Sequence, residues 1–406
     1  MRHPDVRSHS RSLVRTYRYR LYPTRAQSAA QLGQLSFCCD LYNAALQERR
    51  DAWRRGVSVG YHDQARQLTE IRREGLAPPM NSWTQIDSLM RLDRAFATFF
   101  RRCQAGERPG YPRFRQKLRY DSLSWSFRGN AGGVALVEGR LRLQGVGHVK
   151  VKWHRPLPVY AQLKTATVVR RGRRWEVCLT LETPRPRAQA QARVEVGIDL
   201  GVTAFAALSD GTLVPGPRAG RHAARKVRRH QRTVARRRRG SRRRRKAAAR
   251  LARARERERD VRRDHRAKLA HQLATRFSLI AVEDLELVKM TRSAARRVEV
   301  PGRRVRQRAG LNRSQLDQAW GSFLTALRSK AEEAGSVVVT VDPRNTSRTC
   351  AECALVDPSS RRSQNEFVCV ACGYREHADV NAARNILRFG RSLQAPTVED
   401  GPRAVA

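Results

Sequence analysis

The chain has 406 residues, and its 83 lysines and arginines against 36 aspartates and glutamates give a formal net charge of +47. The length allows two or three domains, and 40% hydrophobic residues are enough to build ordinary cores. So large a positive excess repels itself in a compact state, and we expect a polyanion, most simply nucleic acid, to neutralise it. An arginine-biased genome would explain arginine in place of lysine, but not the shortage of acids.

No run of 18 or more apolar residues is present, so we expect no transmembrane helix and no membrane partner. The basic N-terminus lacks the apolar segment of a secretory signal, which favours a cytoplasmic protein. Four cysteines have no metal-ligand spacing and are interpreted as reduced core residues: Cys38, Cys39, Cys103 and Cys178.

The N-terminal part of the chain begins with a strand pattern and continues as helices. Residues 13–23 alternate in polarity and stop at Pro23. From 26 to 102 the apolar residues recur three and four positions apart, which predicts helices, and Pro78–Pro79 divides them into two blocks.

Residues 120–183 return to strand patterns, with hairpin turns expected near Glu138–Gly139 and around Gly172. Residues 183–193 are interpreted as a linker. One interpretation is therefore a β-barrel built from the first strand and the later ones, with a helical insertion between them.

After the linker, buried strands alternate with helices, which indicates an α/β domain. We expect a hairpin over 205–214, a charged helix over 251–275, a basic loop over 292–310 and an amphipathic helix over 314–335. The expected core strands are 194–201, 278–285 and 336–343.

Residues 221–250 contain 16 lysines and arginines and no acid. A charge run is usually the solvated face of a helix. Here no acid relieves the repulsion, which favours an element that binds phosphates by charge and shape without reading bases. The expected contacts are Arg236, Arg237, Arg238, Arg239, Arg242, Arg243, Arg244, Arg245 and Lys246.

The loop at 106–117 mixes glycine and proline with aromatic and basic side chains. Rings beside arginines suit base stacking with phosphate contacts alongside. The same rings could equally anchor the loop in the core, and the sequence leaves both interpretations open. The candidate nucleic-acid contacts are Tyr111, Arg113, Phe114 and Arg115.

The strongest local motif is two CxxC pairs separated by residues 354–368. This spacing is typical of a zinc ribbon, in which two short turns each present two sulfurs to one tetrahedral ion. Chance or a redox pair are the alternatives. Four thiolates leave no open coordination position, so the zinc is expected to be structural. The predicted ligands are Cys350, Cys353, Cys369 and Cys372.

Three acids stand at the ends of predicted elements: Asp199 and Glu283 after the first two core strands, and Asp379 at the start of the last helix. A single acid after a strand is more often a turn or cap residue. Three of them in the α/β part of a basic protein could converge on Mg²⁺, which activates water and stabilises the leaving oxygen in phosphodiester hydrolysis.

Two ambiguities attach to these acids. Asp284 and Glu286 flank Glu283 and could serve instead, although the end of the strand favours Glu283. The segment GIDLG at 197–201 also resembles the first core strand of sugar-kinase and actin-like ATPases. The charge, the ribbon and the lack of a later glycine-rich adenosine loop argue against an ATPase.

Eight motifs follow one another along the chain: YRLYPT, LYNAAL, GYPRFR, GIDLG, RRRRGSRRRRKAAAR, AVEDL, CAEC…CVAC and DVNAARNIL. Together they resemble the TnpB (OrfB) proteins of bacterial insertion sequences, relatives of the type V CRISPR effector nucleases. The resemblance covers the chain from about Tyr17 to Leu387.

The resemblance implies a multidomain α+β fold in which two domains each carry an insertion. The implied parts are a wedge β-barrel (13–25 and 106–190), a helical recognition insertion (26–105), an RNase H-like RuvC α/β nuclease domain (194–344 and 376–390), an inserted zinc ribbon (345–375) and a flexible tail (391–406).

By the same resemblance, Asp199, Glu283 and Asp379 are the catalytic acids that hold Mg²⁺, and the four cysteines hold zinc. Family members take a guide RNA from the transposon end and cut double-stranded DNA beside a short transposon-adjacent motif. RNA and DNA are therefore the expected partners, and the bacterial nucleoid is the expected location.

Two departures from the family pattern are visible. Ala354 stands where the family often has a glycine after the second cysteine, which predicts slight strain in that turn, and the short tail does not extend the fold. Neither removes a chemical group, so we expect an active enzyme. A non-catalytic nucleic-acid-binding regulator and a strand-joining transposase stay open as alternatives, because a transposase also uses acids and Mg²⁺.

Overall fold

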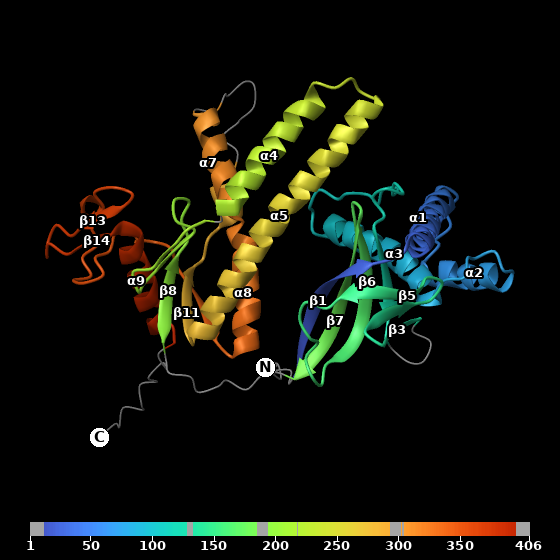
Figure 1. Ribbon diagram of the computed structural model, residues 1–406, viewed down its shortest axis with the longest axis horizontal. Coiled ribbons are helices and arrows are strands. Elements are labelled where there is room, and N and C mark those ends of the chain that lie inside the picture. The colour runs from blue at the N-terminus through green and yellow to red at the C-terminus, as the bar shows by residue number, and fades with distance from the viewer. Residues whose placement is uncertain are drawn as a thin grey trace. The chain divides into compact units, whose positions relative to one another are not determined.

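The computed structural model describes residues 12–127, 133–184, 194–216, 218–292, 302 and 304–394. The chain divides into two compact units, Met1–Arg185 and Pro186–Ala406, each with its own hydrophobic core (Figure 1). Most of the predicted linker and of the predicted tail lies outside the described residues. Within the described ranges, no helix is both long and apolar enough to cross a membrane.

The first unit combines an antiparallel sheet with three helices. The strands are β1 (Ser12–Tyr22), β2 (Ser122–Ser126), β3 (Val134–Val137), β4 (Arg140–Leu143), β5 (Gly147–Lys152), β6 (Gln162–Arg171) and β7 (Arg174–Pro184). They form one seven-stranded sheet in the order β2-β6-β7-β1-β5-β4-β3, which curls into a nearly closed barrel. The helices, which lie between β1 and β2 in the sequence, are α1 (Arg25–Arg54), α2 (Tyr61–Arg73) and α3 (Ser82–Gln104).

The alternation seen in the first strand puts Tyr17, Tyr19 and Leu21 into the barrel core, because successive side chains of a strand point to opposite faces. The expected turn between β3 and β4 is confirmed: Glu138 and Gly139 have φ of 47° and 70°, the left-handed pair that a tight hairpin requires.

Helix α1 begins at a capping box, because the Thr24 hydroxyl accepts from the Gln27 backbone N–H and the Gln27 side chain accepts from the Thr24 N–H. Its buried face packs on the barrel, so Leu35 and Tyr42 share one core with strand residues such as Trp125. The helical segment is therefore anchored on the sheet that it interrupts.

The second unit contains the predicted α/β block. The strands are β8 (Glu195–Asp199), β9 (Ala206–Leu208), β10 (Leu213–Val214), β11 (Leu279–Glu283), β12 (Val337–Val341), β13 (Glu366–Val368) and β14 (Arg375–His377). The helices are α4 (Arg218–Ala235), α5 (Arg242–Arg276), α6 (Leu287–Met290), α7 (Val305–Gln318), α8 (Trp320–Ala334), the 3₁₀ turn Pro358–Ser360 and α9 (Ala378–Ser392).

Five of these strands form a mixed sheet in the order β10-β9-β8-β11-β12. Strands β8, β11 and β12 are parallel, whereas β9 runs antiparallel to β8. Helices α5 and α8 cover one face, where Leu273 and Phe323 meet Ile280. Helix α9 covers the other face, where Ile386 meets Ala281.

Three predictions for individual segments were wrong. The single helix expected over 314–335 is two helices, because Ala319 adopts a left-handed φ of 51° between α7 and α8. The loop expected over 292–310 becomes helical from Val305, and 293–301 and 303 lie outside the described residues. Cys103, expected in the core, is exposed in the last turn of α3.

Candidate active site and metal centre

The three predicted acids converge at one edge of the five-stranded sheet. Asp199 is the last residue of β8 and Glu283 the last residue of β11. The strands are parallel neighbours with Ile198 beside Val282, so their carboxyl ends meet at the same edge. Asp379, in the first turn of α9, is buried against the same edge.

Two glycines let α9 lie this close to the sheet. A Cβ on Gly197 of β8 would stand 2.0 Å from the backbone oxygen of Ala383 and 2.6 Å from the nitrogen of Leu387. A Cβ on Gly390 would stand 2.5 Å from the Cβ of Ala281. The absence of side chains at both positions therefore sets the distance between Asp379 and the strand ends.

All three acids line one pocket of about 480 Å³. Burial, together with the charges of Glu283 and Asp379, raises the pKa of Asp199 to about 7. Asp284 and Glu286 also line the pocket, but both are exposed, and neither contributes to the shift of Asp199. The electrostatics therefore favour Glu283 as the partner of Asp199.

Arg361 and Thr346 are site residues that the sequence did not reveal. Arg361 Nη2 donates to Asp379 Oδ1 at 3.2 Å, and Thr346 Oγ1 donates to Glu283 Oε1 at 2.6 Å. Burial raises the pKa of Glu283, while the Thr346 hydroxyl and the Arg361 charge act to lower it. Both residues come from the segment between β12 and β13, where no sequence pattern marks them.

Two buried asparagines of α9 hold that segment in place. Asn381 accepts from the Ala351 N–H at 2.9 Å and donates to the Thr349 carbonyl at 2.8 Å. Asn385 donates to the carbonyls of Thr346 and Thr349. The i, i+4 pair of asparagines on an otherwise apolar helix face was the available signal for this role.

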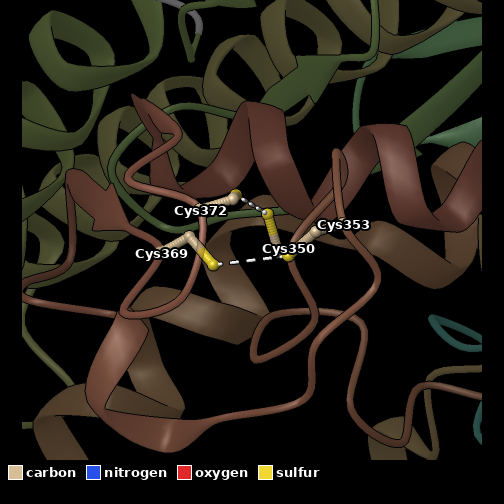
Figure 2. Close-up of side chains that lie close together, drawn as sticks. All are labelled: Cys350, Cys353, Cys369 and Cys372. Atoms are coloured by element: carbon tan, nitrogen blue, oxygen red, sulfur yellow. Dashed lines mark hydrogen bonds between the residues drawn. The ribbon is translucent and has the colours of Figure 1, made fainter.

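The four predicted zinc ligands come together (Figure 2). Cys350 Sγ lies 3.7 Å from Cys372 Sγ, Cys353 Sγ lies 3.5 Å from Cys369 Sγ, and all four sulfurs lie within 4.8 Å of one another. A tetrahedral zinc with Zn–S bonds of about 2.3 Å has S···S edges of about 3.8 Å. The cluster therefore has the dimensions of a four-thiolate zinc site.

Both CxxC turns have the same backbone hydrogen bonds. The Ala354 N–H donates to the Cys350 carbonyl and the Gly373 N–H to the Cys369 carbonyl, each at 3.1 Å. The Cys372 N–H lowers the pKa of the Cys369 thiol to about 6, whereas burial and the neighbouring thiols outweigh the Tyr374 N–H and raise the pKa of the Cys372 thiol to about 12. Ala354 has a left-handed φ of 64° and Gly373 one of 72°, so the strain expected at Ala354 is present.

The basic run lies in the hairpin formed by α4 and α5, whose connection projects away from the sheet (Figure 1). Eight of the nine predicted contact residues are exposed and Arg244 is half-buried, because its guanidinium donates to the Arg237 carbonyl. Ser241 caps α5 by accepting from the Arg244 N–H. The hairpin presents the positive charge that the sequence predicted, and its contacts with nucleic acid stay a prediction.

The 106–117 loop leaves its aromatic rings partly exposed. Tyr111 and Phe114 are 44% and 46% exposed. Asn43 of α1 pins the loop by donating to the Arg115 carbonyl at 2.9 Å and accepting from its N–H at 2.8 Å. The Tyr111 ring also packs edge-on against Phe96 of α3, with ring centroids 5.6 Å apart, so base stacking by this loop stays a prediction.

Three family models match the chain. One described as a probable transposase matches residues 177–294, one described as a helix-turn-helix domain matches 13–57, and one described as a Cas12f1-like TNB domain matches 320–386. Residues 13–57 nevertheless contain one strand and one continuous helix, not two helices joined by a turn.

Two relatives match along almost their whole length. A protein of Streptomyces pristinaespiralis named as an RNA-guided DNA endonuclease is 32% identical over 408 residues, covering 96% of this chain and 92% of that protein. InsQ of Escherichia coli K12, named likewise, is 29% identical over 393 residues, covering 94% of each chain. A Cas12f1–sgRNA–target DNA complex matches with a TM-score of 0.54 and 12% identity, covering 93% of this chain and 99% of that one, which shows a Cas12-like multidomain α+β fold.

Proposed function

The chain belongs to the TnpB (OrfB) family of bacterial insertion sequences, and on this premise we propose that it is an RNA-guided DNA endonuclease. It takes a guide RNA from the transposon end and cuts double-stranded DNA beside a short transposon-adjacent motif. Base pairing with the guide reads the target sequence, while the protein reads only the short flanking motif.

The observation that carries the proposal is the meeting of Asp199, Glu283 and Asp379 in one pocket. In the sheet around them, β8, β9 and β10 are sequential antiparallel neighbours, and β11 and β12 extend the sheet on the other side of β8 as parallel strands, which is the arrangement expected of an RNase H-like RuvC domain. We assign that domain to the second unit, and the wedge barrel with its helical recognition insertion to the first.

The donor set of the pocket fits Mg²⁺, because hard cations prefer carboxylate oxygens. Burial, together with the charges of Glu283 and Asp379, raises the pKa of Asp199, and a bound cation would offset both effects by favouring the carboxylate. When bound, Mg²⁺ supplies an activated water and stabilises the leaving oxygen.

The chain's own residues prepare the pocket for this work. Thr346 fixes the rotamer of Glu283, and Arg361 holds Asp379 while adding a positive charge to a site where negative charge develops. The four cysteines hold structural zinc, which maintains the segment that carries Arg361. The exposed arginines of the α4–α5 connection hold RNA or DNA by its phosphates.

The test is cleavage by protein purified together with the RNA from its native locus. Wild type is expected to cut DNA that matches the guide, and Asp199→Ala is expected to bind the same DNA without cutting it. Asp284→Ala is the matched control, because Asp284 lines the pocket but lies outside the coupled set, and it is expected to cut. Normal cleavage by Asp199→Ala would refute the site, and joined rather than cut strands would indicate a transposase.

A further inference from the structure

A second cavity lies directly beside the acid pocket. It measures about 490 Å³ and is walled by α4, α5, α7 and the loop that follows β8. Val202 and Thr203 of that loop line both cavities, so this loop divides one from the other. Gln318 Nε2 donates to the Val202 carbonyl at 3.3 Å, which ties the dividing loop to α7.

Three arginines line the second cavity: Arg225 and Arg228 from α4, and Arg262 from α5. Arg262 is already engaged, since it lies 3.0 Å from Glu258 and 3.2 Å from Asp317. Arg225 and Arg228 are exposed and form no ion pair with any residue in the described part of the chain. The cavity therefore presents two guanidinium groups, one turn apart, with unused donors.

We propose that Arg225 and Arg228 bind backbone phosphates of the DNA strand that is being cut, within a few nucleotides of the scissile bond. This inference rests on the proposed nuclease function and deepens it. Guanidinium groups recognise phosphates through two parallel hydrogen bonds, and a strand that crosses the Val202–Thr203 loop meets the acids on one side and the arginines on the other. The arginines thus position the strand in register with the acids.

A free anion fits this cavity less well than a strand does. The cavity adjoins the acid pocket across the Val202–Thr203 loop, so a polymer that crosses this loop can occupy both at once. The negative charge of Asp317 on the cavity wall repels a small free anion. A strand that is held elsewhere along its length tolerates this repulsion better. The guide RNA is the other polymer present, and the test separates it from DNA.

The experiment uses the RNA-loaded full chain and target DNA with single neutral methylphosphonates, placed one at a time at the phosphates on either side of each cut. Arg225→Ala/Arg228→Ala is compared with Lys226→Ala/Arg229→Ala, which removes two exposed charges from the same helix but not from the cavity wall. Single-turnover cleavage rates and the amount of co-purified RNA are measured for each.

The double arginine variant is expected to cut unmodified DNA about 10- to 100-fold more slowly, since each hydrogen bond to a charged group contributes about tenfold. Wild type and the control variant are expected to be slowed by methylphosphonate on one side of the cut. The arginine variant is expected to lose that sensitivity, because the contact is already absent. Lysines at both positions are expected to restore part of the rate.

Three results would overturn the inference: wild-type rates in the arginine variant, slowed cutting with methylphosphonate sensitivity intact, or loss of the co-purified RNA, which would assign the arginines to the guide. If wild type itself cuts no matched DNA, the proposed function falls and this inference falls with it. Cutting by wild type and by the arginine variant at equal rates would refute the inference alone.

Discussion

Replacing Gly197 by alanine would test how the site is assembled, because the substitution adds one methyl group and no charge. The new Cβ would stand 2.0 Å from the Ala383 carbonyl oxygen and 2.6 Å from the Leu387 nitrogen. Both are backbone atoms of α9, so no rotamer change relieves the contact. Helix α9 has to retreat by about 1 Å to restore the 3.0 Å below which real Cβ contacts essentially never fall.

The displacement of α9 is expected to change both the melting temperature and the cleavage rate. Overpacking of this kind costs about 1 to 3 kcal/mol, which for a unit of this size lowers the melting temperature by roughly 2 to 12 °C. Because α9 carries Asp379, a shift of about 1 Å is expected to slow single-turnover cleavage about 100-fold. Zinc content and binding of guide RNA are expected to stay at wild-type levels.

Gly310→Ala is the matched control. Gly310 lies inside α7, where an added Cβ would meet no atom of the described residues within 4 Å, and its φ is not in the left-handed region. Alanine there is expected to stabilise the helix by about 0.5 to 1 kcal/mol and leave cleavage unchanged. A Gly197→Ala variant with wild-type melting temperature and rate would refute the close packing of α9 on β8.

Three further predictions concern other parts of the molecule. Ala354→Gly should relieve the left-handed φ and stabilise the zinc turn by up to about 1 kcal/mol, whereas Gly373→Ala should do the reverse, and zinc release to a chelating dye measures both. Asn381→Ala removes the acceptor of the Ala351 N–H and one of the two donors to the Thr349 carbonyl, which keeps its bond from Asn385, so we expect a loss of about 1 to 3 kcal/mol in thermal melting with zinc retained in the folded protein. Iodoacetamide at pH 8 should alkylate exposed Cys103 and spare Cys38, because burial raises the pKa of the Cys38 thiol to about 11 and leaves about one molecule in a thousand as thiolate. Mass spectrometry of the labelled peptides measures this difference, and rapid labelling of Cys38 would contradict its burial.

The sequence predicted the core strands and the convergence of the acids because these depend on local patterns. Apolar runs that end in Asp199 and Glu283 predict where the strands end, and parallel strands bring such ends together. The spacing of the cysteines likewise predicts the geometry of the four-cysteine cluster. In these cases the information lies within a few residues of the functional group.

Other features depend on contacts that no local pattern encodes. Arg361 reaches Asp379 only because the zinc turns and the α9 asparagines fold its segment back over the pocket. The residue at the break between α7 and α8 is Ala319, which is neither glycine nor proline, so the sequence showed no sign of the break. Helix α7 has no buried residue, so no apolar periodicity indicated where it begins. The exposure of Tyr111 and Phe114 is decided by the anchoring of their loop on α1, which composition leaves open.

The position of α9 also has a consequence during protein synthesis. Asp379 follows Asp199 by 180 positions, and at ordinary elongation rates the ribosome needs roughly 10 to 40 s to add them. The barrel and the arginine hairpin are complete before that interval ends, so a nascent chain acquires the surfaces proposed to bind RNA or DNA before its full set of acids. Ribosome-bound chains, and chains from gene copies interrupted upstream of α9, are therefore expected to be harmless to the DNA that they touch.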